Sequence, residues 1–282
     1  MRWYRIAAEN GNADAQNNLG AIYAEGRGTA KSYSEAVKWF RLASDQGDAY
    51  AQNNLGMMYF NGTGVPQSDA EAVKWFRMAA ENGNADAQNN LGSMYENGRG
   101  LAKSYSEAMR FYRLAAEQGN VRAQNNLGAM YAKGSGVPIS YEEAFKWFKM
   151  AAEQGDAEAQ CHLGWMYENA RGALRSDSEA VSWYMLSAEQ GLARSQYYLG
   201  IKYAEGRGVS RSYTEAAKWY RMAAEQGHPG AQSTLGRIYH VGRGVPQSDS
   251  EAVKWLRLAA EQGDEVAKQY LEFMADQSPQ SL

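Results

Sequence analysis

The side chains best suited to covalent chemistry are one cysteine and three histidines. Cys161 precedes His162, and His228 and His240 follow much later in the chain. Neighbouring residues on a helix point about 100° apart, so this thiol and imidazole cannot face each other as a nucleophile and its base. We therefore interpret Cys161 as a lone thiol and expect no catalytic residue.

The same histidines do not have the pattern of a metal site. His162 and His240 are predicted on two separate helices, and His228 is predicted at a helix start. Packed helices lie roughly 8 to 10 Å apart, so helices two repeats apart cannot share one ion. The glycine-rich turns follow helices rather than strands and lack the Lys-Ser or Lys-Thr of a phosphate-binding loop. The sequence predicts neither a metal nor a cofactor.

Paired asparagines are the first candidate for non-covalent binding. A carboxamide carries both donors and an acceptor, so a row of them could bond the backbone of an extended peptide. Alternatively, one asparagine of each pair holds a neighbouring loop and the other faces water. Both interpretations stay open for the four pairs, which are Asn17-Asn18, Asn53-Asn54, Asn89-Asn90 and Asn125-Asn126.

Aromatic and basic residues replace these asparagines later in the chain. Trp, Tyr and Arg are the types that dominate binding energy when a partner covers them. We therefore predict a contact patch formed by His162, Trp165, Tyr197, Tyr198, Arg237 and His240. In the alternative interpretation, the aromatic side chains are buried between helices.

The elements that must position these residues recur every 36 residues without insertion. Leu-Gly dipeptides mark the period at Leu19-Gly20, Leu55-Gly56, Leu91-Gly92, Leu127-Gly128, Leu163-Gly164, Leu199-Gly200 and Leu235-Gly236. A tryptophan position and a glutamine position repeat in the same register. Such self-similarity is typical of a solenoid, in which each repeat contacts only its neighbours.

Each repeat is predicted to contain two helices. The first spans residues 13–25 in the first repeat, with Ala15, Leu19 and Tyr23 on one buried stripe. Gly20 beside the stripe lets the partner helix approach, and the glycines of Gly26-Arg27-Gly28 end the helix.

The second helix is predicted to start at a capping box. In that motif the Ser32 side chain accepts from the Glu35 amide, and the Glu35 side chain accepts from the Ser32 amide. A buried stripe then follows, and Gly47 ends the helix. The stripe contains Ala36, Trp39, Phe40 and Ala43.

These patterns predict an all-α chain of seven repeats with a half-repeat at each end. The half-repeat covers residues 1–11, a capping helix covers 264–276, and 277–282 form a disordered tail. The seven repeats cover residues 12–47, 48–83, 84–119, 120–155, 156–191, 192–227 and 228–263. The first half-repeat carries Trp3, Tyr4 and Ile6 without obvious cover, so self-association through this helix is one expectation.

The overall charge argues against nucleic acid as a partner. The chain has 29 Lys and Arg against 32 Asp and Glu, and the two signs are interspersed in every repeat. No stretch of 18 apolar residues occurs, so we expect no membrane insertion. As written, the chain is expected in the cytoplasm, or in the periplasm or outside the cell if a signal peptide is missing from it.

The repeat unit resembles a known family. The pattern A-x-A-Q-x-x-L-G-x-x-Y-x-x-G-x-G-V, followed by S-x-x-E-A-x-K-W-F/Y-R-x-A-A-E-Q-G, is similar to the Sel1-like repeat (SLR) of the tetratricopeptide superfamily. The resemblance covers essentially the whole chain. It implies a right-handed superhelix of helix pairs whose concave face is lined by the first helices. It also implies a scaffold that binds a protein or peptide in that groove, with the asparagine pairs and the contact patch as its lining.

Two other functions remain as alternatives. Hydrolysis of beta-lactam or peptidoglycan-like substrates has been attributed to cysteine-rich members of this family, but this chain has one cysteine and none of their disulfides. The other alternative is a structural array that assembles through its N-terminal helix. The scaffold is the preferred hypothesis, and we predict that the chain is not an enzyme.

Overall fold

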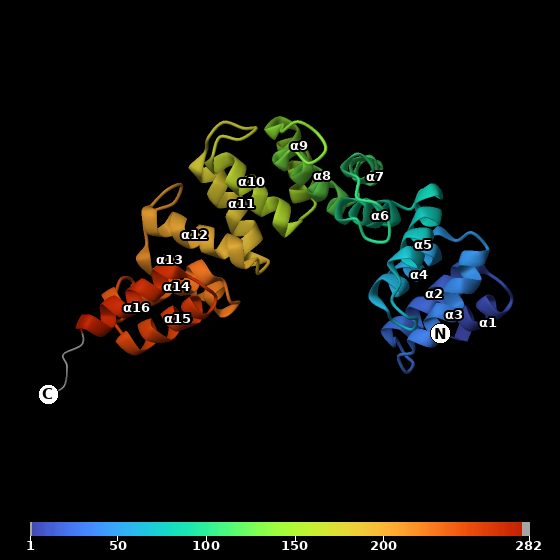
Figure 1. Ribbon diagram of the computed structural model, residues 1–282, viewed down its shortest axis with the longest axis horizontal. Coiled ribbons are helices and arrows are strands. Elements are labelled where there is room, and N and C mark those ends of the chain that lie inside the picture. Colours follow the sequence, from blue (N-terminus) through green and yellow to red (C-terminus); the bar gives the residue numbers. More distant parts are fainter. Residues whose placement is uncertain (1, 278–282) are drawn as a thin grey trace. The chain divides into compact units, whose positions relative to one another are not determined.

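The computed structural model describes residues 2–277, which form sixteen α-helices joined by short loops (Figure 1). The helices are α1 (Arg2–Glu9), α2 (Ala13–Glu25), α3 (Tyr33–Asp45), α4 (Ala49–Asn61), α5 (Asp69–Glu81), α6 (Ala85–Asn97), α7 (Tyr105–Glu117), α8 (Val121–Lys133), α9 (Tyr141–Glu153), α10 (Ala157–Glu168), α11 (Asp177–Glu189), α12 (Ala193–Glu205), α13 (Tyr213–Glu225), α14 (Pro229–Val241), α15 (Asp249–Glu261) and α16 (Glu265–Gln277).

The chain forms two compact units. Unit 1 runs to Ser140 and contains α1 to α8, and unit 2 begins at Tyr141 and contains α9 to α16. Within each unit every helix packs against the next helix in the chain. Even-numbered helices are called first helices and odd-numbered helices second helices. The predicted all-α solenoid of helix pairs is confirmed.

The first helices begin and end as local sequence signals predict. In α2 the Asn12 side chain accepts from the Ala15 amide at 2.8 Å, and Leu19 is fully buried. Gly26 ends the helix in the left-handed conformation, with a φ of 76°. Such a conformation strains residues that carry a Cβ atom. In α14, His228 is the N-cap and Pro229 occupies the first turn, as predicted.

The second helices confirm half of the predicted capping box. Ser32 Oγ accepts from the Glu35 amide at 3.3 Å, as predicted. The reciprocal bond was a wrong prediction, because the Ser32 amide donates instead to the Tyr23 carbonyl at 2.9 Å. That carbonyl lies in the last turn of α2 and has no partner within its helix. The capping serine therefore ties the two helices of a repeat together, and the same bond recurs at Ser68, Ser104, Ser140, Ser176, Ser212 and Ser248.

The glycine of each Leu-Gly dipeptide marks a close helix contact. A Cβ atom on Gly20 would lie 2.6 Å from Cδ1 of Phe40, closer than real contacts allow. This confirms the predicted role of Gly20. Ala36, Phe40 and Ala43 are buried as expected. Trp39 is only partly buried, since it packs at the side of α3 against the preceding repeat.

The repeated glutamines form a buried hydrogen-bonded row between repeats. Gln16 Nε2 donates to the Ala8 carbonyl at 3.0 Å, and Gln16 Oε1 accepts from Gln46 Nε2 at 2.7 Å. Each such glutamine thus joins the end of the preceding second helix to the end of its own repeat. Gln52, Gln88, Gln160, Gln196 and Gln232 make the same pair of contacts.

The first and last helices expose different surfaces. On α1 the side chains of Trp3, Tyr4 and Ile6 are 80%, 46% and 41% exposed. On α16 the side chain of Glu272 is exposed, in the place of the glycine of Leu-Gly. Of the predicted tail 277–282, residue 277 ends α16 and the rest lies outside the described residues.

Candidate functional site

The asparagine pairs of unit 1 bond to one another. Asn54 Nδ2 donates to Asn17 Oδ1 at 2.9 Å, so that neighbouring first helices are linked by their side chains. Asn90 donates to Asn53 and Asn126 to Asn89 in the same way, at 3.0 and 3.1 Å. These bonds run from one first helix to the next, a contact that neither interpretation of the sequence included. Asn18 remains exposed, whereas Asn125 is partly buried. Peptide binding by this row stays a prediction.

In unit 2, other residues stand at the register positions of the asparagine pairs, and they make different contacts. Cys161 is buried, and Arg194 Nε donates to its sulfur at 3.3 Å. Arg194 also forms an ion pair with Glu158 at 2.5 Å. Burial raises the pKa of the Cys161 thiol. Since the thiolate is the reactive form, this cysteine is poorly suited to be a nucleophile.

Tyr197 and Tyr198 form part of a continuous aromatic row. The Tyr197 ring lies 6.0 Å from Tyr198, 5.8 Å from Tyr220 and 4.6 Å from His228, between ring centres. Tyr198 in turn lies 5.2 Å from Tyr184. Both tyrosines are half-buried, and burial raises the pKa of Tyr198. The interpretation that aromatics pack between helices therefore describes these two better than full exposure does.

The other predicted contact residues lie in two places. On α10, Trp165 is 38% exposed, and His162 stacks on Phe148 with ring centres 4.4 Å apart. Trp165 makes no ring contact with Tyr197 or Tyr198 within the described part of the chain. At the other end of unit 2, the His240 ring lies 5.6 Å from Tyr270. Partner binding at the six residues of the predicted patch stays a prediction.

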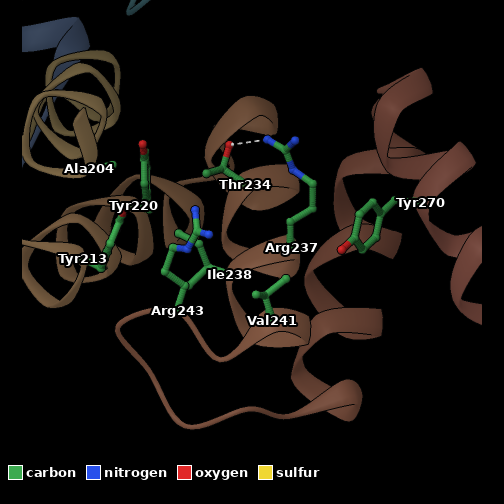
Figure 2. Close-up of a pocket in the computed structure, with 9 residues that line it drawn as sticks. All are labelled: Ala204, Tyr213, Tyr220, Thr234, Arg237, Ile238, Val241, Arg243 and Tyr270. Carbon is green, nitrogen blue, oxygen red and sulfur yellow. Dashed lines mark hydrogen bonds between the residues drawn. The ribbon is translucent and has the colours of Figure 1, made fainter.

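A cavity of about 370 Å³ opens over α12, α14 and α16 (Figure 2). Among the predicted residues only Arg237 lines it. His240 lies beside it, where its Nδ1 bonds Asp249 at 2.9 Å. The cavity is lined by Ala204, Tyr213, Tyr220, Thr234, Arg237, Ile238, Val241, Arg243 and Tyr270.

Four of these lining residues were missed because they come from other parts of the repeat. Tyr213 and Tyr220 belong to a second helix, Arg243 to a turn, and Tyr270 to the predicted cap. One signal was available: the position of Tyr213 alternates between tyrosine and aspartate along the chain, as in Asp69 and Asp177. Where this residue is tyrosine and an arginine follows 30 residues later, the arginine lies over the ring and pairs with no carboxylate within residues 2–277, as at Tyr141 with Arg171 and at Tyr213 with Arg243.

Unit 2 also contains a buried cation, which is a lysine of α12. Lys202 is 1% exposed and bonds Glu168, with Asp177 at 3.5 Å. Glu168 also accepts from the Tyr184 hydroxyl at 3.0 Å, and Arg207 bonds Asp177 at 2.9 Å. Every charge in this cluster has a partner of opposite sign, so it holds repeats together and offers no open site.

Residues 2–277 contain neither a cluster of metal-binding side chains nor a membrane-spanning helix. No three His, Cys, Asp or Glu side chains come together there in a way that could hold a metal ion. In the same range, none of the helices has the length and apolar character needed to span a bilayer.

Comparison with known proteins supports the predicted resemblance. The Sel1 repeat model matches residues 1–12, 13–48, 49–84, 85–120, 121–156, 157–192, 193–228 and 229–264. No curated protein matches. Repeats of this family generally mediate protein binding, and most members are non-catalytic.

Solved structures add two similar proteins. A protective antigen of uropathogenic Escherichia coli strains, with an SLR fold, is 39% identical over 98% of this chain, with a TM-score of 0.89. This chain spans 59% of that antigen's length. A Sel1 repeat protein from Oxalobacter formigenes is 33% identical, over 86% of this chain and 96% of its own, with a TM-score of 0.78. The chain belongs to the Sel1 repeat family.

Proposed function

We propose that this chain is a scaffold that holds a segment of a partner protein in the cavity over α12, α14 and α16. One observation carries the proposal: the cavity is open and lined by arginine, tyrosine and aliphatic side chains. Arginine and tyrosine are among the types that supply most of the binding energy at protein interfaces. A cavity of this size suits one or two side chains of a bound segment.

The family relationship supports the same class of function. Sel1 repeats generally mediate protein binding, and three lining residues have types that no other repeat has at the same register position. These are Thr234, Arg237 and Val241. Arg237, for example, occupies a position that is Ala21, Ser93 or Ala129 in other repeats. Trp165 is proposed as a secondary contact in unit 2, and the asparagine row as a separate contact surface of unit 1.

The test is selection from a random library of displayed 12-residue peptides on the immobilised chain. The matched variant is Arg237→Ala with Tyr270→Ala, two changes at side chains that are not buried. Enriched peptides should bind the unaltered chain and lose about 30-fold or more in affinity for the variant, as interface hot spots do. Circular dichroism would verify that the variant is folded.

Two results would count against the proposal. If peptides were enriched equally on the unaltered chain and on the variant, they would bind outside this cavity. No enrichment on either would remove the support for a peptide-binding cavity. A control with Asn17→Ala and Asn53→Ala tests whether the asparagine row contributes.

A further inference from the structure

Two guanidinium groups share the cavity without a carboxylate to neutralise them. Arg237 is exposed, and its only hydrogen bond is a long one from Nη2 to Thr234 Oγ1 at 3.5 Å (Figure 2). Arg243 is also exposed, with its guanidinium carbon 5.0 Å from the centre of the Tyr213 ring. None of the nine lining residues is acidic, and neither arginine has an ion pair within the described part of the chain.

Comparison with other repeats shows what Arg243 lacks. Arg99 occupies the same register position and bonds Asp69 at 2.7 Å, 30 residues earlier. Arg207 bonds Asp177 at 2.9 Å in the same way. At the corresponding position opposite Arg243 the residue is Tyr213, just as Tyr141 lies opposite Arg171. The substitution removes the internal anion and leaves the cation in place.

The acidic side chains on the flanking helices are already engaged. Glu205, at the end of α12, lies 3.3 Å from Arg207. Asp249, at the start of α15, lies 2.9 Å from His240 Nδ1. Neither is a lining residue of the cavity. Within residues 2–277, no carboxylate forms an ion pair with Arg237 or Arg243.

The rest of the lining is apolar or aromatic. Val241 is 59% exposed, and Ile238 and Tyr270 are partly exposed beside it. Burial of such surface by a ligand is favourable. The cavity thus offers two cations next to a surface for an apolar side chain.

We propose that this cavity recognises an acidic segment of a partner protein. An aspartate or glutamate carboxylate binds Arg237 and Arg243, and an adjacent apolar side chain packs on Ile238, Val241 and Tyr270. Guanidinium groups bind carboxylates through charged, often paired hydrogen bonds, and these are stronger than neutral ones. This inference rests on the proposed function and specifies the chemistry of the partner.

Defined peptide pools test the inference on the full chain. Each pool consists of nine-residue peptides with blocked ends and a fixed central residue. The two positions next to the centre hold an equimolar mixture of Leu, Val and Phe, and the other positions hold uncharged residues. The central residue is Glu in one pool, Gln in the second and phosphoserine in the third. The measurement is retention on the immobilised chain, quantified by mass spectrometry.

The Glu pool should be retained roughly tenfold more strongly than the Gln pool, the range expected for a hydrogen bond to a charged group. The variant Arg237→Gln with Arg243→Gln should bring the Glu pool down to the level of the Gln pool. A matched variant, Arg27→Gln with Arg122→Gln, removes two exposed charges in unit 1 and should leave the preference intact.

Three outcomes would overturn the inference. Equal retention of the Glu and Gln pools would remove the acidic preference, while enrichment of random peptides would still support the proposed function. An equal loss in the Arg27 and Arg122 variant would assign the preference to net charge. Stronger retention of the phosphoserine pool, dependent on Arg237 and Arg243, would assign the cavity to phosphate instead.

Discussion

At the scale of single residues, His228 is the N-cap of α14. Its Nδ1 accepts from the Ala231 amide at 3.2 Å, which requires the neutral ring. Burial lowers the pKa of His228, and the nearby Arg194 adds to the effect. The unfolded chain, with an ordinary histidine pKa of about 6.5, therefore binds this proton more readily than the folded chain does.

This difference predicts a pH dependence for unit 2. The stabilising contribution of His228 is complete above about pH 6.5 and is lost as the pH falls toward its folded pKa. Loss of an N-cap costs about 1 kcal/mol. His228→Asn keeps an acceptor at the cap and should remove this dependence, as measured by urea unfolding from pH 7.5 to 5. His240→Asn, as a control, should leave it unchanged; an unaltered slope in His228→Asn would contradict the assignment.

Lys202 is the other unusual residue, because equivalent positions hold Met58, Met94 or Ile238. Lys202→Met alone leaves Glu168 without its main cation. We expect a loss of about 1 to 3 kcal/mol in the free energy of unfolding, the cost of an unsatisfied buried group.

A matched variant separates the effect of the buried charges on stability from the effect of side-chain packing. Combining Lys202→Met with Glu168→Ala and Tyr184→Phe installs residues that other repeats use at these three positions. Because this removes Lys202 together with the Glu168 carboxylate and the Tyr184 hydroxyl, and leaves Asp177 paired with Arg207, most of the stability should return. The measurement is chemical unfolding. If the triple variant were less stable than the single one, the network would be net stabilising.

At the scale of the helix pair, the glutamine row is the strongest link between successive repeats. Gln88 is 5% exposed, donates to the Ala80 carbonyl at 3.2 Å and accepts from Gln118 at 2.7 Å. Gln88→Met fills a similar volume but removes both side-chain hydrogen bonds, and the Ala80 carbonyl keeps its bond from the Gly83 amide. The expected loss is about 1 to 3 kcal/mol, seen as reduced hydrogen-exchange protection in α5 to α7.

An exposed glutamine provides the control for this prediction. Gln67 bonds the Phe60 carbonyl at 3.1 Å within a surface turn. Gln67→Met should change stability by less than about 0.5 kcal/mol. If both substitutions cost the same, burial of the row would not explain its effect.

The helix pairs also show which features of the fold can be predicted from sequence. Helix bounds, the Ser32 cap and the Gly26 turn depend on residues a few positions apart, so local chemistry predicts them. The Ser32 to Tyr23 bond was missed because its acceptor lies on another helix, nine residues earlier. Prediction from sequence therefore fails first for hydrogen bonds whose two partners lie on different helices.

The candidate site shows the same limit more strongly. Arg237 could be selected because its type departs from its register. Tyr213, Arg243 and Tyr270 come from different repeats, and only the packing of α13, α14 and α16 brings them to one cavity. The tyrosines at 197 and 198 looked exposed by helical spacing, but large rings can turn into gaps between helices that spacing does not describe.

At the scale of the whole molecule, each unit is a linear array in which helices pack mainly on their chain neighbours. In such an array, a local defect lowers the stability of adjacent repeats and not of distant ones. A destabilising substitution far from the cavity should therefore lower local stability without changing binding, whereas one beside the cavity should affect both.

Two glycines of the same register position test this separation. A Cβ atom on Gly56 would lie 2.6 Å from Phe76 Cδ1, and one on Gly236 would lie 2.6 Å from Leu256 Cγ. Each Gly→Ala change should cost about 1 to 3 kcal/mol through overpacking. Gly56→Ala should reduce hydrogen-exchange protection only around α3 to α6 and leave binding of the Glu pool unchanged. Gly236→Ala, next to Arg237, should reduce protection around α13 to α16 and weaken that binding. Equal effects of both changes on binding would mean that the cavity depends on the cooperative stability of the whole chain.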